Sequence, residues 1–502
     1  MEDRDFFSEQ VLDPFLDVVH KLPNEHAFQI NGVFYTYKQL GEYISKIRRA
    51  INSHSNGGKN IGLVANDDLE TYASIFAIWL EGCAYVPLHH NQPLERSLEI
   101  ISQADIDLVI DSSPYSAFKK EAIIESARLE YEAINLSPKS TSNLALAYIL
   151  FTSGSTGKPK GVPISRANVG SFMKSFWEVG FNIDHNDRCL QCFDLTFDVS
   201  VQSFLVPLTK GACTYTIPHD QIKYSYIYGL FEEHKLTFGA MAPSMIRYLR
   251  PYFEEIHAPS MRYNILTAEA SPLDLVGEWS NCIPNAEIFD FYGPTEATIY
   301  CTYYKYVRNG PNKHLNGISS IGKAMNGLCA IIIDEDRRVL DANQRGELCI
   351  SGGQITPGYW NNPEKNAESF FEMVHEGTLC RFYRTGDSCY MDNDGDIMYS
   401  GRLDFQVKIQ GYRIELGEIE HYAREYVNGQ NAVAVAFENK AGNNEIALFI
   451  EGEMIDIGLM LEYLKSKMPY YKIPTKIIVK DIFPLNANGK TDRNALKKLI
   501  II

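Results

Sequence analysis

Short β-rich runs alternate with helical patterns through the first 300 residues of the chain. Strand-like runs at 60–67 and 84–88 flank a helical pattern at 69–82. The alternation returns between residues 227 and 293, where 244–256 is one of the helical patterns. Such alternation is typical of βαβ units in a mostly parallel sheet. Because ligands bind at the carboxyl ends of the strands in these sheets, we expect a site where strands end.

The pattern changes twice in the second half of the chain. From about residue 318 it becomes strand–turn–strand, which indicates a small antiparallel β subdomain. A chain of 502 residues is too long for one hydrophobic core. We predict an α/β fold with a large N-terminal domain (1–403) of βαβ subdomains plus the small β subdomain. A small, mobile α+β domain (404–502) follows.

Charge and hydropathy exclude several functions. The formal net charge of −16 argues against broad binding to nucleic acid or to an anionic membrane. The most apolar helical pattern is interrupted by Glu81 after about ten residues, which suits a buried helix rather than membrane insertion. The acidic N-terminus lacks a signal region, so we expect a cytoplasmic protein. The close pair Cys189 and Cys192 has no partner motif and is predicted to be two ordinary cysteines.

The run FTSGSTGKPKG, residues 151–161, crowds hydroxyl residues, glycines and lysines together. It is not the nucleoside-triphosphate P-loop, because Gly154 and Gly157 are too close and Pro159 prevents a helix from starting at the lysine. A loop that holds polyphosphate through hydroxyls, glycine amides and the charge of Lys160 is one interpretation. A surface turn is the other.

Further motifs settle the choice in favour of phosphate. The run YILFTSGSTGKPKGVPISRANV resembles the phosphate-loop signature of the adenylate-forming superfamily: acyl-CoA synthetases, luciferases and peptide-synthetase adenylation domains. Other resembling motifs occur in family order: YTYKQL, LEGCAYVPL, FDVS, FYGPTEAT, GELCISGG, GYW, YRTGD, GRLDFQVKIQGYRIELGEIE and NANGKTDR. The resemblance implies ATP and Mg²⁺ as cofactors. It also implies a hinge at Asp404, whose rotation brings Lys408 and Gly411 to the site; a β-hairpin at a domain boundary is the alternative.

The same resemblance implies a nucleotide site. Glu296 is expected to bind Mg²⁺, because a hard cation prefers carboxylate oxygens. Asp387 is expected to accept hydrogen bonds from the ribose hydroxyls, and Arg402 to approach ribose or phosphate oxygens. A surface ion pair is the alternative for either residue. The small domain is expected to carry Lys490 to the substrate carboxylate. The catalytic set is Lys490, Glu296, Thr295 and Lys160, and the nucleotide-binding set is Thr152, Ser153, Gly154, Ser155, Thr156, Gly157, Lys160, Phe291, Tyr292, Gly293, Thr295, Asp387, Arg402 and Lys490.

The run CFDLTFDVSVQSF bears on the substrate. The family motif F-D-x-S places Asp198, not Asp194, where it pairs with the α-ammonium of an amino acid. A fatty or aryl acid has no such cation, and an unpaired buried aspartate costs several kcal/mol. A capping or turn aspartate is the alternative. The motifs align the substrate pocket with Asp198, Val199, Gln202, Ala240, Leu266, Ala268, Phe291, Ile299 and Tyr300.

We therefore expect a two-step ligase. An amino acid and ATP give aminoacyl-AMP and pyrophosphate, and the aminoacyl group then passes to the phosphopantetheine thiol of a separate carrier protein. The chain is similar to the stand-alone D-alanine–D-alanyl carrier protein ligases, so D-alanine is the best single candidate. Their CGE run reads Thr267, Ala268, Glu269 here. An acid–CoA ligase using the same adenylate is the nearest alternative, and a nucleotide-binding regulator without catalysis is another.

Overall fold

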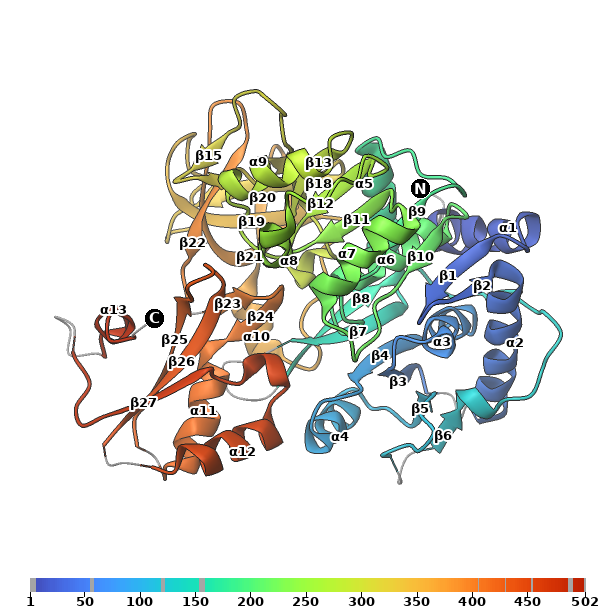
Figure 1. Ribbon diagram of the computed structural model, residues 1–502, viewed down its shortest axis with the longest axis horizontal. Coiled ribbons are helices and arrows are strands. Elements are labelled where there is room, and N and C mark those ends of the chain that lie inside the picture. Colours follow the sequence, from blue (N-terminus) through green and yellow to red (C-terminus); the bar gives the residue numbers. More distant parts are fainter. Residues whose placement is uncertain are drawn as a thin grey trace. The chain divides into compact units, whose positions relative to one another are not determined.

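The computed structural model describes the chain except for residues 1–5, 55–57, 119–121, 153–158, 405, 429, 453–454, 486–490 and 501–502. The chain forms two compact units, each considered by itself (Figure 1). The first comprises Met1–His90, Ile101–Leu150 and Gly161–Gly401. The second comprises Asn91–Ile100, Phe151–Lys160 and Arg402–Ile502.

A nine-stranded sheet forms the centre of the first unit, in the order β17-β14-β13-β12-β11-β9-β10-β1-β2. Its strands from β13 to β1 pair in parallel, as the βαβ pattern predicts. The strands are β1 (His26–Ile30), β2 (Val33–Thr36), β9 (Arg188–Leu190), β10 (Cys213–Tyr215), β11 (Phe238–Met241), β12 (Tyr263–Leu266), β13 (Glu287–Tyr292), β14 (Thr302–Lys305) and β17 (Lys323–Ala324). The helices in this part of the chain are α6 (Asp198–Leu208), α7 (Lys223–His234), α8 (Pro243–Leu249) and α9 (Leu273–Cys282).

One helix is shorter than the sequence pattern predicts. The pattern at 244–256 suggested a single helix, but α8 ends at Leu249 and a 3₁₀ turn, Arg250–Tyr252, follows. Pro251 explains the difference, because a proline has no amide hydrogen with which to continue the helical hydrogen bonds.

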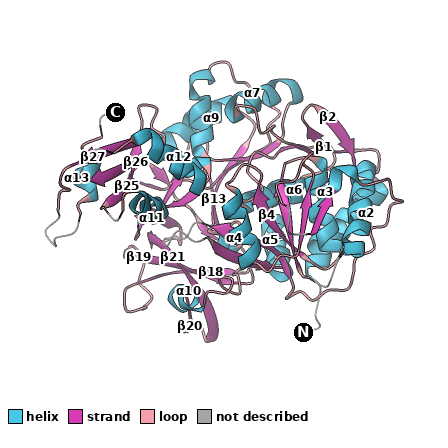
Figure 2. Cartoon of the chain, turned by 90° about the horizontal axis from the view of Figure 1, so that it is seen from below, coloured by secondary structure: helices cyan, strands magenta, loops and turns pink. Residues whose placement is uncertain are grey.

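A second, six-stranded sheet has the order β6-β5-β3-β4-β7-β8. Helix α3 is buried against this sheet, since every residue of the helix except Glu70 is buried. The Asp68 side chain caps its first turn by accepting a hydrogen bond from the amide of Thr71. Figure 2 shows strands of the first unit running between helices. The elements are β3 (Asn60–Ala65), β4 (Ala84–His89), β5 (Leu108–Asp111), β6 (Ala122–Glu125), β7 (Leu146–Thr152), β8 (Lys160–Ser165), α1 (Asp13–Lys21), α2 (Tyr37–His54), α3 (Leu69–Leu80), α4 (Leu94–Gln103) and α5 (Arg166–Glu178).

The predicted antiparallel β subdomain is present within the first unit. Its strands pair in the order β18-β19-β21-β20, and β22 pairs with β21. The elements are β15 (His314–Leu315), β16 (Ile318–Ser319), β18 (Leu328–Ile333), β19 (Gly346–Gly352), α10 (Pro363–Ser369), β20 (Phe370–His375), β21 (Thr378–Met391) and β22 (Ile397–Arg402).

The C-terminal residues form the expected α+β arrangement. A three-stranded sheet, β25-β26-β27, encloses a small core that includes Phe449, Phe483 and Leu496. The elements are β23 (Gln406–Ile409), β24 (Tyr412–Glu415), α11 (Leu416–Tyr426), β25 (Ala432–Glu438), β26 (Asn444–Glu451), α12 (Ile457–Lys467), β27 (Lys476–Lys480) and α13 (Arg493–Lys497).

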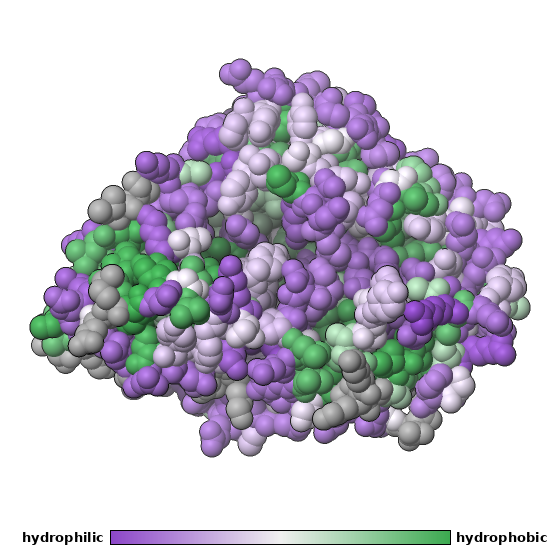
Figure 3. Space-filling view, turned by 60° about the horizontal axis from the view of Figure 1, so that its bottom comes forward, coloured by the Kyte–Doolittle hydropathy of each residue, from purple (hydrophilic) through white to green (hydrophobic). Residues whose placement is uncertain are grey.

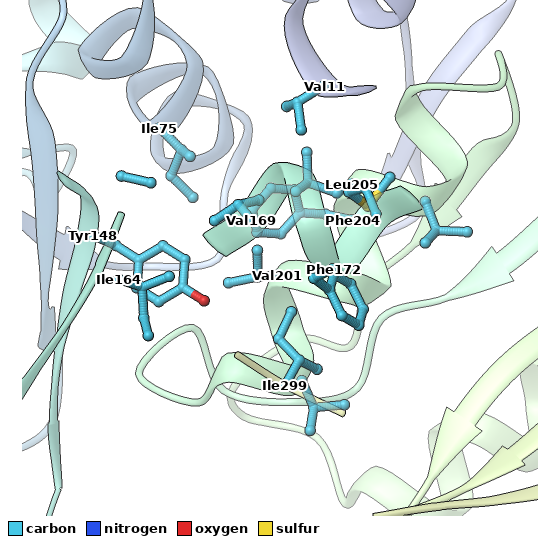
Figure 4. Close-up of a cluster of buried hydrophobic side chains, with 14 of the residues drawn as sticks. Val11, Ile75, Tyr148, Ile164, Val169, Phe172, Val201, Phe204, Leu205 and Ile299 are labelled. Carbon is cyan, nitrogen blue, oxygen red and sulfur yellow. The ribbon is translucent and has the colours of Figure 1, made fainter. Parts of the chain in front are cut away.

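The main core of the first unit surrounds helix α6. Figure 4 shows Val201, Phe204 and Leu205 of α6 beside Phe172 of α5 and Ile299 of the β13–β14 connection. Every residue of α6 is buried, so the polar residues of this helix are buried with it. Among the described residues, no helix is both long enough and apolar enough to span a membrane. The face in Figure 3 is mostly hydrophilic, with apolar side chains gathered in patches.

Candidate active site

Neighbouring parallel strands bring the expected pocket residues to one edge of the nine-stranded sheet. In the strand register Met241 lies opposite Leu266, and Leu266 lies opposite Asp290. The carboxyl ends of β11, β12 and β13 therefore meet, with Ala240, Leu266 and Phe291 at or next to them. Strand β9 ends at the same edge, and the chain then leads to α6.

Asp198 is the first residue of α6 and is 7% exposed. The N-cap residue is Phe197, so Asp198 is not the N-cap of this helix. Burial, and next the nearby Asp198 carboxylate, raise the pKa of Tyr85 and of Tyr300. The carboxylate thus lies near buried tyrosines, at a helix N-terminus where the backbone dipoles stabilise negative charge.

Gln202 lies one helical turn after Asp198, where the Cβ atoms are about 5–6 Å apart on the same helix face. The Tyr300 hydroxyl donates to Gln202 Oε1 over 3.3 Å, and both side chains are fully buried. The Tyr300 ring lies against Phe291, with centroids 5.0 Å apart. Among the described residues, the Gln202 Nε2 atom has no hydrogen-bond acceptor. The structure therefore joins three of the predicted pocket residues into one wall.

The other aspartate of the run has a different environment. Asp194 forms an ion pair with His89, whose Nε2 lies 2.8 Å from the carboxylate, and accepts from the amide and hydroxyl of Thr196. Burial alone raises the pKa of Asp194, but the bonds from His89 and Thr196 outweigh burial and lower it. Sequence reasoning did not predict the His89 partner, which lies at the end of β4, over 100 residues earlier.

Asp67, after strand β3, is a second carboxyl in this region. Burial raises its pKa to about 8, against the lowering effect of the hydrogen bond from Tyr72 and of Lys223, while Asp194 raises it further. The folded protein holds this proton to higher pH than the unfolded chain, whose aspartates have a pKa of about 4. The resulting stabilisation is complete below that value and is lost as the pH rises through 8.

We therefore expect Asp67→Asn to stabilise the protein increasingly with pH. Relative to wild type, its unfolding free energy should rise by up to about 1.4 kcal/mol per pH unit between pH 5 and 8 and then level off. Thermal unfolding of both proteins across pH 5–9 measures this. Parallel curves for the two proteins would contradict the raised pKa.

Ala268 adopts a left-handed conformation with φ of +68°, directly after β12 and Thr267. The resembling run CGE has glycine here, and glycine adopts positive φ without strain. Alanine costs about 1–2 kcal/mol in this conformation. Replacement of the glycine in the CGE run by Ala268 therefore introduces backbone strain in this structure.

We expect Ala268→Gly to leave stability within about 1 kcal/mol of wild type, since relief of strain opposes the greater freedom of the unfolded chain. Removal of one methyl from the pocket wall should raise kcat/KM about 5-fold for an amino acid one carbon larger, within the 1–3 kcal/mol that a methylene contributes. Steady-state kinetics and chemical denaturation check both values. An unchanged preference between the two substrates would place Ala268 outside the pocket wall.

The segment after β13 carries Glu296, which is 1% exposed. Its Oε1 accepts from the hydroxyl of Tyr359, 2.6 Å away, which belongs to the GYW motif. Gly293 permits the tight path of this segment, because a Cβ there would lie 2.3 Å from the carbonyl oxygen of Ile299. Thr295 begins a short 3₁₀ turn, Thr295–Ala297, which contains Glu296. The Tyr359 partner was not predicted, although its motif was.

Asp387 accepts a short hydrogen bond from Tyr292, and both residues are buried. Burial, then the Asp387 carboxylate, raise the pKa of Tyr292. Asp387 lies in strand β21 and is buried rather than at the surface. The two predicted nucleotide residues meet although 95 residues separate them.

In the second unit, Arg402 forms an ion pair with Asp404 through two hydrogen bonds of 2.9 and 2.6 Å, as the ion-pair alternative for Arg402 describes. Burial raises the pKa of Asp404, but Arg402 outweighs burial and lowers it. Lys160 begins β8, and its Nζ lies 3.4 Å from a carboxylate oxygen of Glu415. Thr152 Oγ1 donates to the carbonyl of Lys160 over 3.4 Å.

The remaining nucleotide residues are not placed. Ser153, Gly154, Ser155, Thr156, Gly157 and Lys490 lie outside the described residues. Lys408 and Gly411 belong to the β23–β24 hairpin, with Gly411 in the turn at φ of +81°. Val199 and Ile299 are buried members of the main core cluster.

The fold is that of an α/β protein in which buried carboxylates and tyrosines gather near the ends of strands. The chain belongs to the AMP-binding enzyme family, which it matches over residues 15–360. This confirms the adenylate-forming superfamily to which the motifs pointed.

Two curated relatives come from Brevibacillus parabrevis. One of the linear gramicidin synthase proteins is 31% identical and tyrocidine synthase 1 is 30% identical, each over 96% of this chain. The chain spans only 9% and 44% of their respective lengths.

Two solved structures share the fold. The adenylation domain AlmE of Vibrio cholerae, in complex with glycyl-adenosine-5'-phosphate, matches with a TM-score of 0.84 and 24% identity over 99% of this chain and 98% of AlmE. PA1221, described as an NRPS protein containing adenylation and PCP domains, matches with a TM-score of 0.85 and 22% identity over 97% of this chain and 84% of PA1221. These likenesses confirm the α/β fold.

Proposed function

We propose that this chain activates an amino acid as its adenylate with ATP, releases pyrophosphate, and transfers the aminoacyl group to the phosphopantetheine thiol of a separate carrier protein. The observation that carries the proposal is the buried Asp198 carboxylate at the start of α6, surrounded by tyrosines and Gln202. An α-ammonium group suits this position, because burial of a carboxylate is costly unless a cation or hydrogen bonds compensate it.

The wall one turn beyond Asp198 favours a small substrate side chain. Gln202, Tyr300 and Phe291 close the space there with bulky, buried groups. The Gln202 amide, with its Nε2 hydrogens not bonded to any described residue, offers donors to a water or a small polar group. D-alanine is our single best candidate, and the chirality of the substrate is part of what the experiment below decides.

The residues also fit a nucleotide and a divalent cation. Glu296 supplies a buried carboxylate oxygen, which Mg²⁺ prefers, and the cation when bound neutralises phosphate charge. Tyr359 orients that carboxylate by its hydrogen bond. Asp387 supplies acceptors for a ribose diol, and Tyr292 orients it. We assign phosphate contacts to Thr295, Lys160 and the loop at 152–157, and stabilisation of the reacting oxygens to Lys490.

The division at residue 403 is part of the same proposal. We propose that residues 404–502 move as a body about Asp404, whose pairing with Arg402 fixes the backbone at the pivot. Such hinge motions let one site perform two successive steps.

Amino-acid-dependent ATP–pyrophosphate exchange, measured across L- and D-amino acids together with aryl and fatty acids, tests the function. We expect exchange with one small amino acid. Exchange only with acids that lack an amino group would overturn the role of Asp198. Aminoacylation of coenzyme A, with no transfer to a carrier protein, would support the acid–CoA ligase instead.

A further inference from the structure

The loop that leads into Tyr300 has an unusual backbone. Thr298 and Ile299 adopt left-handed conformations, with φ of +54° and +76°. Both are β-branched residues, for which positive φ is rare and costs free energy. Two such residues in succession persist only where the surrounding structure holds them. This loop presents Ile299 and Tyr300, two of the predicted pocket residues.

Gln354 holds the loop through its side-chain amide. Its Nε2 lies 3.2 Å from the carbonyl oxygen of Ala297, 3.4 Å from that of Thr298 and 2.6 Å from that of Tyr300. The orientation of the amide follows from these contacts, because only the NH₂ group can donate to carbonyl oxygens. In return, the Thr298 hydroxyl donates to the backbone carbonyl of Gln354. Gln354 is fully buried.

Contacts of the Ile299 and Tyr300 side chains also hold this loop. The Ile299 side chain lies in the core near Val201 (Figure 4), and the Tyr300 hydroxyl donates to Gln202. Gln354 comes from the segment after β19, more than 50 residues later in the chain, and was not among the predicted site residues. Without its amide, three carbonyl groups of a strained, buried loop lose a donor.

We propose that Gln354 is a positioning residue for the side-chain pocket: it holds the strained loop 297–300 so that Tyr300 closes the pocket against Gln202. This inference rests on the proposed function, since the pocket is that of the amino-acid substrate. Glu296 has its own supports, because its carbonyl accepts from the amide of Thr356 and its carboxylate accepts from Tyr359. The effect of Gln354 should therefore fall on the amino acid rather than on ATP.

Gln354→Leu tests the proposal, because leucine has similar bulk but no donor. We expect KM for the best amino acid to rise about 10-fold, with KM for ATP within 3-fold of wild type. We also expect the ratio of kcat/KM between that amino acid and one two carbons larger to fall about 10-fold. Thr209→Val is the matched control: it removes a buried hydroxyl that donates to the carbonyls of Leu205 and Val206 rather than to the loop 297–300. It should lower thermal stability without changing the ratio.

A loss of kcat for all amino acids with the ratio unchanged would overturn the proposal, because that is what a general loss of folded protein produces. If Gln354→Leu does not fold, Thr298→Ala removes one bond of the same clamp, and a ratio within 1.5-fold of wild type would overturn the proposal equally. Exchange by the wild-type protein distinguishes a failure of the proposed function from a failure of the role of Gln354. If it shows no amino-acid-dependent exchange, the proposed function fails, whereas a selective wild type with selective variants rejects only the role of Gln354.

Discussion

Asp198→Asn is expected to lower kcat/KM for the amino acid by about 10²–10³-fold in ATP–pyrophosphate exchange. Asparagine keeps the shape of the side chain but removes the charge that we pair with the substrate ammonium. Loss of one partner of a buried ion pair costs about 3–5 kcal/mol, and each 1.4 kcal/mol is a factor of ten. Most of the loss should appear in KM for the amino acid, because the charge binds the substrate before and during the reaction.

Asp194→Asn is the matched control for this substitution. Asp194 lies four residues before Asp198, just ahead of α6, but it is paired with His89 rather than assigned to substrate. Its replacement should destabilise the protein while KM for the amino acid stays within about 3-fold of wild type. A larger effect on KM from Asp194→Asn than from Asp198→Asn would exchange the two roles.

Lys490→Ala is expected to reduce adenylation by about 10³-fold and to leave transfer from preformed aminoacyl-adenylate within about 5-fold of wild type. The physical reason is that the ammonium group stabilises charge on the carboxylate and phosphate oxygens only while the adenylate forms. If the C-terminal residues carry this lysine away for the second step, that step does not need it. Pyrophosphate exchange measures the first half-reaction, and loading of a phosphopantetheinylated carrier from synthetic adenylate measures the second.

Lys498→Ala provides the comparison, because Lys498 is an exposed lysine of the same C-terminal segment. It removes one positive charge and should change neither half-reaction by more than about 2-fold. Equal loss of both half-reactions in Lys490→Ala would show that the lysine acts in a step that they share, and would contradict the assignment.

The class of fold could be predicted from the sequence. Periodicity placed β3, α3 and β4 to within two residues, because long alternating patterns reflect burial directly. The family could be predicted as well, since ordered motifs span nearly the whole chain and the family match covers residues 15–360. The edge that gathers Ala240, Leu266 and Phe291 follows from a general property of parallel sheets.

Side-chain partners could not be predicted in this way. Three side-chain pairs join residues that are 63, 95 and more than 100 positions apart: Tyr359 with Glu296, Tyr292 with Asp387, and His89 with Asp194. No local pattern encodes such pairs, because each depends on how the chain crosses between strands. The short α8 was different: Pro251 indicated its end in the sequence.

Asp194 and Asp198 show which properties of the site the sequence predicts and which depend on the tertiary structure. The sequence alone predicts a substrate-binding carboxylate in CFDLTFD, and the motif assigns that role to Asp198. The folded chain was needed to show that Asp194 pairs with His89 at the end of β4, and that Gln354, after β19, donates to the strained loop carrying Tyr300. Hydrophobic periodicity is read from neighbouring residues and is therefore visible in the sequence. The hydrogen-bond partners in a core are distant residues that only folding brings together.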